Sequence, residues 1–174
     1  MSNQVRTAGG PAVAPEQALQ FLKDGNQRFV EGKPQSSKVD SIMRKELDRE
    51  GQAPHTAIIG CADSRCPLET LFDTLPGDIF VLRNAGNTCT HAEGSMVGSL
   101  EFCAGKLGSK LIMVMGHTQC GAIAGATKTY LANKDGKGSK SADSALEGLL
   151  MGLSDVAEQA GSCHALQTAS PFFI

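Results

Sequence analysis

The chain has 174 residues, the length of one domain with a substantial core, yet it contains no tryptophan and only one tyrosine. Its 16 basic and 18 acidic side chains give a formal net charge of −2, so the charge does not indicate binding to nucleic acid or to an anionic membrane. No apolar run approaches the length of a membrane span, and the N-terminus lacks the hydrophobic core of a secretory signal.

The first predicted element follows an N-terminal stretch rich in small residues. Residues 1–14 are expected to form a flexible arm, and residues 15–174 a single domain. Pro15 suits the first turn of a helix, and apolar side chains then recur at helical spacing over about residues 15–31. A second, more polar helix is predicted over about residues 37–50, ending at a glycine.

The body of the chain alternates short apolar strands with helices. Such strands, separated by helical segments, are typical of a parallel sheet covered on both faces, so the fold class is α/β with a mainly parallel central sheet. Nothing after Tyr130 has the pattern of a strand. Strands are predicted at Thr56–Gly60, Ile79–Arg83 and Lys110–Met115, with helices at about residues 68–74, 92–106, 121–131 and 142–160.

Three potential metal ligands follow two of these strands. Cys61 comes directly after the first strand, and His117 and Cys120 come after the third, one helical turn apart. Two thiolates and one imidazole form a three-ligand zinc set with a fourth position left for water, as in catalytic zinc sites. If the two strands are neighbours, these residues meet at the carboxyl edge of the sheet, where α/β folds carry their sites.

Asp63 and Arg65 follow Cys61 at alternate positions. If the backbone stays extended there, all three side chains face one cavity. Two thiolates neutralise the charge of zinc, so a bound water loses its proton less readily than on three histidines. Arg65 supplies positive charge and can hold Asp63 by two hydrogen bonds, which keeps the carboxylate ionised and able to orient a hydroxide. Released from Arg65, Asp63 can become a fourth zinc ligand; an ordinary surface ion pair is the alternative interpretation.

At these residues the sequence resembles the β-class carbonic anhydrases. The resemblance covers about residues 15–130. Its motifs are Ala18 to Val30, Cys61-Ala-Asp-Ser-Arg65, Gly77 to Asn87 and Gly116-His-Thr-Gln-Cys-Gly121.

The resemblance implies a role for each matching residue. It implies one zinc per chain, and Asp63 with Arg65 as the catalytic pair. Gln52 matches a glutamine that binds a substrate oxygen, and Phe80 an aromatic wall of the substrate pocket. The implied zinc ligands are Cys61, His117 and Cys120.

The resemblance also implies a reaction and an assembly. The reaction is the reversible hydration of carbon dioxide to bicarbonate and a proton by zinc-bound hydroxide. Family members form at least a homodimer, in which the N-terminal helix lies over the neighbouring subunit. They usually continue to a further C-terminal strand that has no counterpart here, so this part of the fold is expected to be shortened. No nucleic-acid or membrane partner is expected.

Two other functions stay open at this point. One is hydrolysis of carbonyl sulfide or carbon disulfide on the same fold, because these molecules are also linear and uncharged. The other is a catalytically silent zinc-binding assembly subunit.

The remaining cysteines and histidines are interpreted as structural. The six cysteines are too sparse for a disulfide scaffold and read as thiols in a reducing compartment, which predicts a cytoplasmic protein with an organelle left open. Cys66 is the one filler thiol that sits close enough to the motif to be oxidation-sensitive. The other cysteines predicted to be small apolar fillers or incidental thiols are Cys89, Cys103 and Cys163. The histidines predicted at the surface or at caps, with a proton-shuttle role left open, are His55, His91 and His164.

Overall fold

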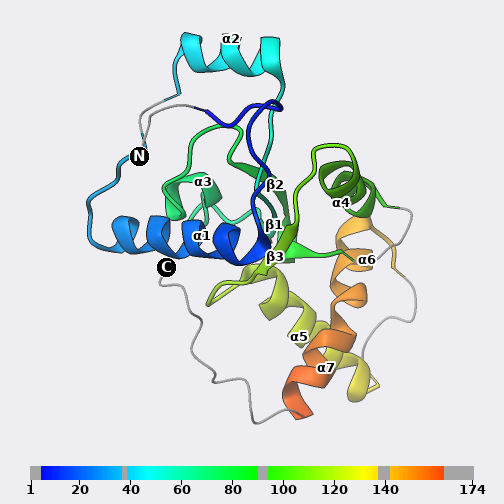
Figure 1. Cartoon of the computed structure of the whole chain (residues 1–174). Helices are drawn as coiled ribbons and strands as arrows, with labels where there is room; N and C mark the ends of the chain where they lie inside the picture. Colours follow the sequence, from blue (N-terminus) through cyan, green and yellow to red (C-terminus); the bar gives the residue numbers. More distant parts are fainter. Residues whose placement is uncertain (1–4, 37–38, 90–93, 137–141, 163–174) are drawn as a thin grey trace. The chain divides into compact units, whose positions relative to one another are not determined.

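The computed structural model describes residues 5–36, 39–89, 94–136 and 142–162 (Figure 1). Residues up to Met115 form one compact unit, and a second compact unit begins at Gly116. Among the described residues, none of the helices combines the length and the apolar character needed to cross a membrane.

A parallel three-stranded sheet organises the first unit. Strand β1 (Thr56–Cys61) lies in the middle, with β2 (Ile79–Asn84) on one side and β3 (Leu111–Met115) on the other. Cys61 pairs with Asn84, and Gly60 pairs with both Arg83 and Met115. All six residues of β1 are buried, as expected for an apolar central strand. The predicted parallel sheet is confirmed, and the first and third strands are neighbours, which is the condition for their ends to meet.

The starts of the first two helices are set by a proline and by a capping aspartate. The sequence predicts a helix from Pro15, and α1 does begin there because proline has no N–H to satisfy at that position. Helix α2 begins later than predicted, because the side chain of Asp40 accepts hydrogen bonds from the N–H groups of Ile42 and Met43 and caps it. The helices are α1 (Pro15–Val30), α2 (Ser41–Glu50), α3 (Leu68–Leu71) and α4 (Ser95–Gly105), with a short 3-10 turn η1 (Ala85–Asn87) after β2.

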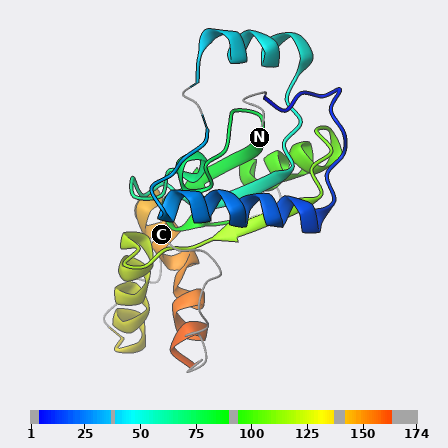
Figure 2. The same cartoon turned by 60° about the vertical axis from the view of Figure 1, so that its left-hand side comes forward.

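One face of the sheet carries the main hydrophobic core. Helix α1 lies across this face, and both views show it alongside the strands (Figures 1 and 2). Burial of apolar side chains from α1, α3 and the strands removes their surface from water, which is the main stabilising contribution here. The central members of this core are Leu22, Ile58, Leu68, Phe72 and Met115.

The other face is only partly covered. Helix α4 packs on β1 and β2, but the alternate residues Ile112 and Val114 of β3 are 50% and 63% exposed. The expectation of a sheet covered on both faces is therefore wrong for β3 in the part of the chain that the structure describes. The reason is that α4 makes its main contacts with the other two strands.

Residues 5–8 pack against the rest of the first unit, in contrast to the flexible arm expected over residues 1–14. Val5 is buried with Met43 and Leu75. The Arg6 Nε donates to the carbonyl oxygen of Ala53 at 3.0 Å, and Thr7 forms an isolated antiparallel bridge with Gln52. A small apolar anchor and backbone pairing therefore fix this segment, which composition alone did not indicate.

The second unit is helical in its described residues. Helix α5 (Gly121–Lys134) contacts both α6 (Ala145–Gly152) and α7 (Ser154–Ser162), and Figure 2 shows them running alongside one another. The prediction of a single helix over residues 142–160 is wrong, because the helix is interrupted at Leu153 between α6 and α7. Glycine at the end of α6 weakens the helix, and the hydroxyl of Ser154 donates to the Met151 carbonyl at 2.6 Å.

Candidate metal centre

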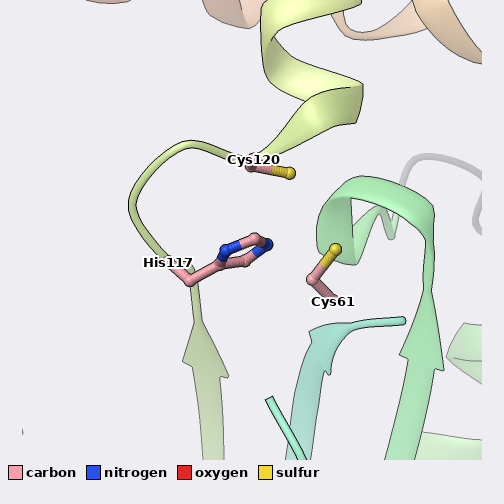
Figure 3. A group of neighbouring side chains, drawn as sticks. All are labelled: Cys61, His117 and Cys120. Atoms are coloured by element: carbon pink, nitrogen blue, oxygen red, sulfur yellow. The ribbon is translucent and has the colours of Figure 1, made fainter. Parts of the chain in front are cut away.

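The three predicted metal ligands come together. Cys61 is the last residue of β1, His117 follows β3, and Cys120 immediately precedes α5. One nitrogen of His117 and the two sulfurs all lie within 4.8 Å of one another. Figure 3 shows the imidazole and both thiol groups turned toward a common point. Both cysteines are buried and His117 is half-buried.

The segment carrying His117 and Cys120 is shaped by a tight turn. Gln119 has a φ of 54°, in the left-handed region that reverses the chain before α5. The Nδ1 of His117 lies 3.0 Å from the carbonyl oxygen of Thr118. A carbonyl only accepts, so in a neutral ring this contact places the proton on Nδ1, and Nε2 is then the nitrogen able to bind a metal.

The donor set fits zinc. Thiolate sulfur and imidazole nitrogen are the ligands that zinc prefers, at about 2.3 and about 2.0 Å. Ligand atoms that share one zinc ion therefore lie roughly 4 Å apart, close to the grouping seen here. Cys61, His117 and Cys120 are the residues that would hold the ion, and three protein ligands are typical of catalytic zinc.

The backbone after Cys61 turns instead of staying extended. The side-chain Oδ1 of Asp63 accepts from the N–H of Arg65 at 2.9 Å, and the N–H of Cys66 donates to the Asp63 carbonyl at 3.0 Å. The expectation of an extended Cys61–Arg65 segment is therefore wrong. An aspartate that bonds its own following backbone favours such a turn.

The two-point contact between Asp63 and Arg65 is present within this turn. Arg65 Nε donates to Asp63 Oδ1 at 2.9 Å, and Nη2 donates to Oδ2 at 2.8 Å. The carboxylate side chain is 23% exposed, whereas the arginine side chain is 53% exposed. This geometry fixes the plane of the carboxylate beside the candidate metal centre.

Arg83 also binds this turn, and the sequence reasoning missed it. Its Nε donates to the carbonyl oxygen of Cys61 at 2.9 Å, and its Nη2 donates to the carbonyl oxygen of Asp63 at 2.6 Å. Its position at the end of the predicted second strand was the available signal, because parallel strands end at the same edge of a sheet.

Cys66 lies close to the candidate metal centre but is buried. Its sulfur lies within 4.8 Å of a nitrogen of His117 and a carboxylate oxygen of Asp63. Burial raises the pKa of the Cys66 thiol, and the negative charges of Asp63 and Cys61 raise it further. A protonated, buried thiol is a poor metal ligand, which agrees with the predicted role as an apolar filler.

Within one chain, Gln52 and Phe80 lie away from Cys61. Phe80 is half-buried, pairs with Ala57 near the amino end of β1, and has its ring centroid 6.3 Å from that of Phe102. Cys61 lies at the opposite end of β1, on the order of 13 Å further along the strand. Gln52 precedes β1 and is half-buried beside Thr7.

The remaining histidines and cysteines differ in how much the structure says of them. His55 was predicted at the surface or at a cap, but it is buried and its ring lies edge-on to that of Phe21. Cys103 is buried, in agreement with a filler role, and Cys89 is exposed. The predictions for His91, Cys163 and His164 fall outside the described residues.

Comparison with known proteins defines the family. The family model described as carbonic anhydrase matches residues 56–169. This chain belongs to the β-class carbonic anhydrases. Carbonic anhydrase 2 of Mycobacterium tuberculosis is 42% identical over 113 residues, which are 65% of this chain and 53% of that protein. The chain therefore spans about half the length of the curated relatives it matches.

Solved structures of the same class share the fold. A β-carbonic anhydrase of Coccomyxa, solved with acetazolamide, matches with a TM-score of 0.58 at 27% identity, covering 86% of this chain and 62% of that one. One described as a tetrameric β-carbonic anhydrase of Sordaria macrospora matches with a TM-score of 0.56 at 27% identity, covering 86% and 71%. The α/β fold predicted from the sequence is confirmed.

Proposed function

We propose that this chain catalyses the reversible hydration of carbon dioxide to bicarbonate and a proton, with one zinc ion held by Cys61, His117 and Cys120. The observation that carries the proposal is the grouping of these three ligand atoms within 4.8 Å in a member of the β-class carbonic anhydrases. Zinc, when bound, supplies Lewis-acid chemistry that makes water a nucleophile near neutral pH.

Asp63 and Arg65 are the proposed catalytic pair. Two hydrogen bonds from Arg65 stabilise the ionised form of Asp63 and fix both of its oxygens. A carboxylate held in this way accepts a hydrogen bond from the attacking oxygen, so that a lone pair of that oxygen faces the carbon of the substrate. If the hydrogen bonds from Arg65 break, Asp63 becomes available as a fourth metal ligand, and it would then occupy the position that the attacking oxygen needs.

Gln52 and Phe80 are proposed to contact the substrate, as an amide donor and an apolar wall. Phe80 lies on β2 opposite Ala57, and Gln52 precedes β1, so one chain keeps both residues toward the end of its sheet opposite Cys61. This placement supports their supply to the site by a second copy of the chain. We therefore propose a homodimer or a higher homo-oligomer as the active form. The solved relative described as tetrameric agrees with assembly of this kind. Light scattering on the purified protein measures the number of chains.

The cytoplasm is the proposed compartment. None of the cysteines that the structure describes forms a disulfide bond, which suits a reducing environment.

Stopped-flow measurement of proton release on mixing with carbon dioxide tests the proposed reaction. The protein should contain about one zinc per chain and accelerate the reaction, and Cys61→Ser should lose both properties. Cys89→Ser is the matched control, because Cys89 is exposed and outside the ligand group, and it should keep both.

Three other results would each reject the proposal. Zinc-loaded protein that gives no acceleration between roughly pH 6.5 and 9 would exclude the reaction, since zinc-bound water ionises near neutral pH. Hydrogen sulfide release from carbonyl sulfide or carbon disulfide that outpaces carbon dioxide hydration would indicate the alternative hydrolase. Zinc without an exchangeable water would indicate an assembly subunit.

A further inference from the structure

We propose that Arg83 is a positioning residue that holds the turn carrying Cys61 and Asp63 in the geometry needed at the metal centre. The proposal rests on the function proposed above, because it assigns a second arginine to the same site. It concerns the backbone of Asp63, whereas Arg65 acts on its carboxylate.

The contacts of Arg83 bracket one peptide segment. Its two donors reach the carbonyl oxygens of Cys61 at 2.9 Å and of Asp63 at 2.6 Å, on either side of Ala62. The N–H of Ala62 donates in turn to the carbonyl oxygen of Asn84 at 2.8 Å. The end of β2 therefore holds three successive residues of the turn by hydrogen bonds.

The two arginines bind different parts of Asp63: Arg65 its carboxylate, and Arg83 its backbone carbonyl oxygen. Arg65 binds both carboxylate oxygens, but both residues lie on the same short turn and can move together. Arg83 comes from β2, a separate strand paired with β1, and so fixes the turn to the sheet. A guanidinium suits this task because its planar fork donates in two directions at once and stays charged at all relevant pH values.

The effect of removing this side chain should be local. Arg83 is an exposed residue, so its truncation leaves the hydrophobic core intact. What it removes is the pair of side-chain hydrogen bonds from β2 to the carbonyl groups of the turn, so that the peptide between Ala62 and Asp63 can rotate. Rotation displaces the turn that carries Asp63 and Arg65 relative to the sheet, and it displaces the carbonyl group of Cys61, a metal ligand.

Hydrogen exchange and cobalt spectroscopy test this role apart from catalysis. In the zinc-loaded protein, Arg83→Ala should speed the exchange of the Cys66 amide, which bonds the Asp63 carbonyl, and leave the exchange of the Ile58 amide unchanged. Zinc affinity should fall by about 10- to 100-fold, as for other residues that orient metal ligands. The absorption spectrum of the cobalt-substituted protein should change in position or intensity, because the surroundings of the ligands change.

Two further variants make the result decisive. Arg83→Lys should restore part of the zinc affinity and of the wild-type cobalt spectrum, since one ammonium reaches a carbonyl but lacks the fork. Arg49→Ala, which removes an exposed arginine from α2, should match the wild type in every readout. If Arg83→Ala does not fold, the lysine variant decides alone, by a zinc affinity below that of the wild type.

The possible failures are distinguishable. Unchanged Cys66 exchange, zinc affinity and cobalt spectrum in Arg83→Ala would overturn the positioning role, whatever the protein catalyses. A wild-type protein that binds zinc but does not hydrate carbon dioxide would overturn the proposed function, while these readouts would still report on the turn.

Discussion

Arg65 holds the carboxylate of Asp63 by a planar two-point contact, and this pair is the residue-scale feature closest to the proposed chemistry. Arg65→Ala removes both hydrogen bonds but none of the three metal ligands. We expect zinc to stay bound and activity to fall about 10- to 100-fold, as for other residues that orient metal-site groups. The loss should be greatest near neutral pH, where the freed Asp63 competes best with hydroxide for the fourth position on zinc.

A pH–rate profile with zinc analysis of each sample measures this effect. Arg49→Ala serves again as the control for loss of an exposed arginine. A profile of unchanged shape in Arg65→Ala would contradict the proposed role of the pair.

His55 makes the stability of the zinc-free fold depend on pH. Burial, together with the smaller effect of the Arg6 charge, lowers the pKa of His55 to about 4. The unfolded chain, with an ordinary histidine pKa, binds a proton first as the pH falls, so the folded state loses stability below about pH 6.5. The loss between about pH 7 and about pH 5 should be about 2 kcal/mol.

Urea unfolding of zinc-free protein at the two pH values measures this loss. His55→Gln keeps a hydrogen-bonding group near the Thr56 hydroxyl, which lies 2.8 Å from the His55 Nδ1, but does not titrate. It should therefore lose about 2 kcal/mol less than the wild type over this range. Equal losses in both proteins would show that His55 does not cause the pH dependence.

At the scale of elements, α1 passes very close to the chain segment that follows α3. A Cβ atom added at Gly25 would lie 1.8 Å from the carbonyl oxygen of Phe72, so neither backbone could stay in place. Gly25→Ala should destabilise the fold by about 3 kcal/mol, at the upper end of typical overpacking costs.

Gly98→Ala is the matched control, because Gly98 lies within α4 and a Cβ there meets nothing within 4 Å. This substitution should stabilise the protein by up to about 1 kcal/mol, through better helix propensity. Denaturant unfolding of both variants measures the difference. Equal stability of the two would mean that α1 does not approach Phe72 so closely.

Asp73 ties three segments of the first unit together. Its buried carboxylate accepts from the side chain of Arg28 on α1, and from the N–H groups of Gln35 and Ser36 at 2.9 Å each. Burial alone would raise the pKa of Asp73, but the hydrogen bonds from Ser36, Gln35 and Arg28 outweigh it and lower the pKa to about 2. The ionised carboxylate is thus stabilised in the folded state.

Asp73→Asn removes this charge without changing the backbone preference. Asp73 has a φ of 46°, and asparagine tolerates the left-handed region well. Because the folded pKa is lowered, the stabilisation is full above about pH 4 and is lost as the pH falls towards 2. The variant should therefore lose about 2 kcal/mol at neutral pH and lack that part of the acid dependence below about pH 4. An acid-unfolding curve identical to that of the wild type would exclude this linkage.

The elements themselves were largely predictable from local patterns, and their exceptions have physical causes. The wholly apolar segment at β1 and Pro15 at the start of α1 are strong local signals, and both elements appear where expected. The break at Leu153 depends on a serine hydroxyl that bonds a carbonyl, which periodicity does not detect. The exposed face of β3 and the buried His55 depend on which neighbour covers each residue, and that is decided by tertiary packing.

At the scale of the whole molecule, the metal ligands were predictable and their supports were not. Cys61 ends one apolar strand, His117 and Cys120 follow another, and the ends of parallel strands meet at one edge of a sheet. The turn at Asp63 was missed because an aspartate can bond its own backbone or stay extended, and the sequence does not distinguish these. Arg83 was missed because its two acceptors are backbone carbonyl oxygens. Every residue has such an oxygen, so the residue types at positions 61 and 63 do not indicate this contact.

The same arrangement makes zinc a stabilising ligand of the whole fold. Cys61 and Cys120 belong to segments that lie far apart in the sequence, and only the folded chain brings their sulfurs within 4.8 Å. A ligand that binds the folded state alone stabilises it by about 2.7 kcal/mol when its free concentration is 100 times the dissociation constant. Removing zinc with a chelator should therefore lower the melting temperature by several degrees, and adding zinc back should restore it. Cys120→Ser should melt at the same temperature with and without zinc, whereas Cys89→Ser should respond like the wild type. An equal zinc response in Cys120→Ser and the wild type would show that the stabilising ion binds elsewhere, and calorimetric melting of the three proteins, each with and without zinc, decides this directly.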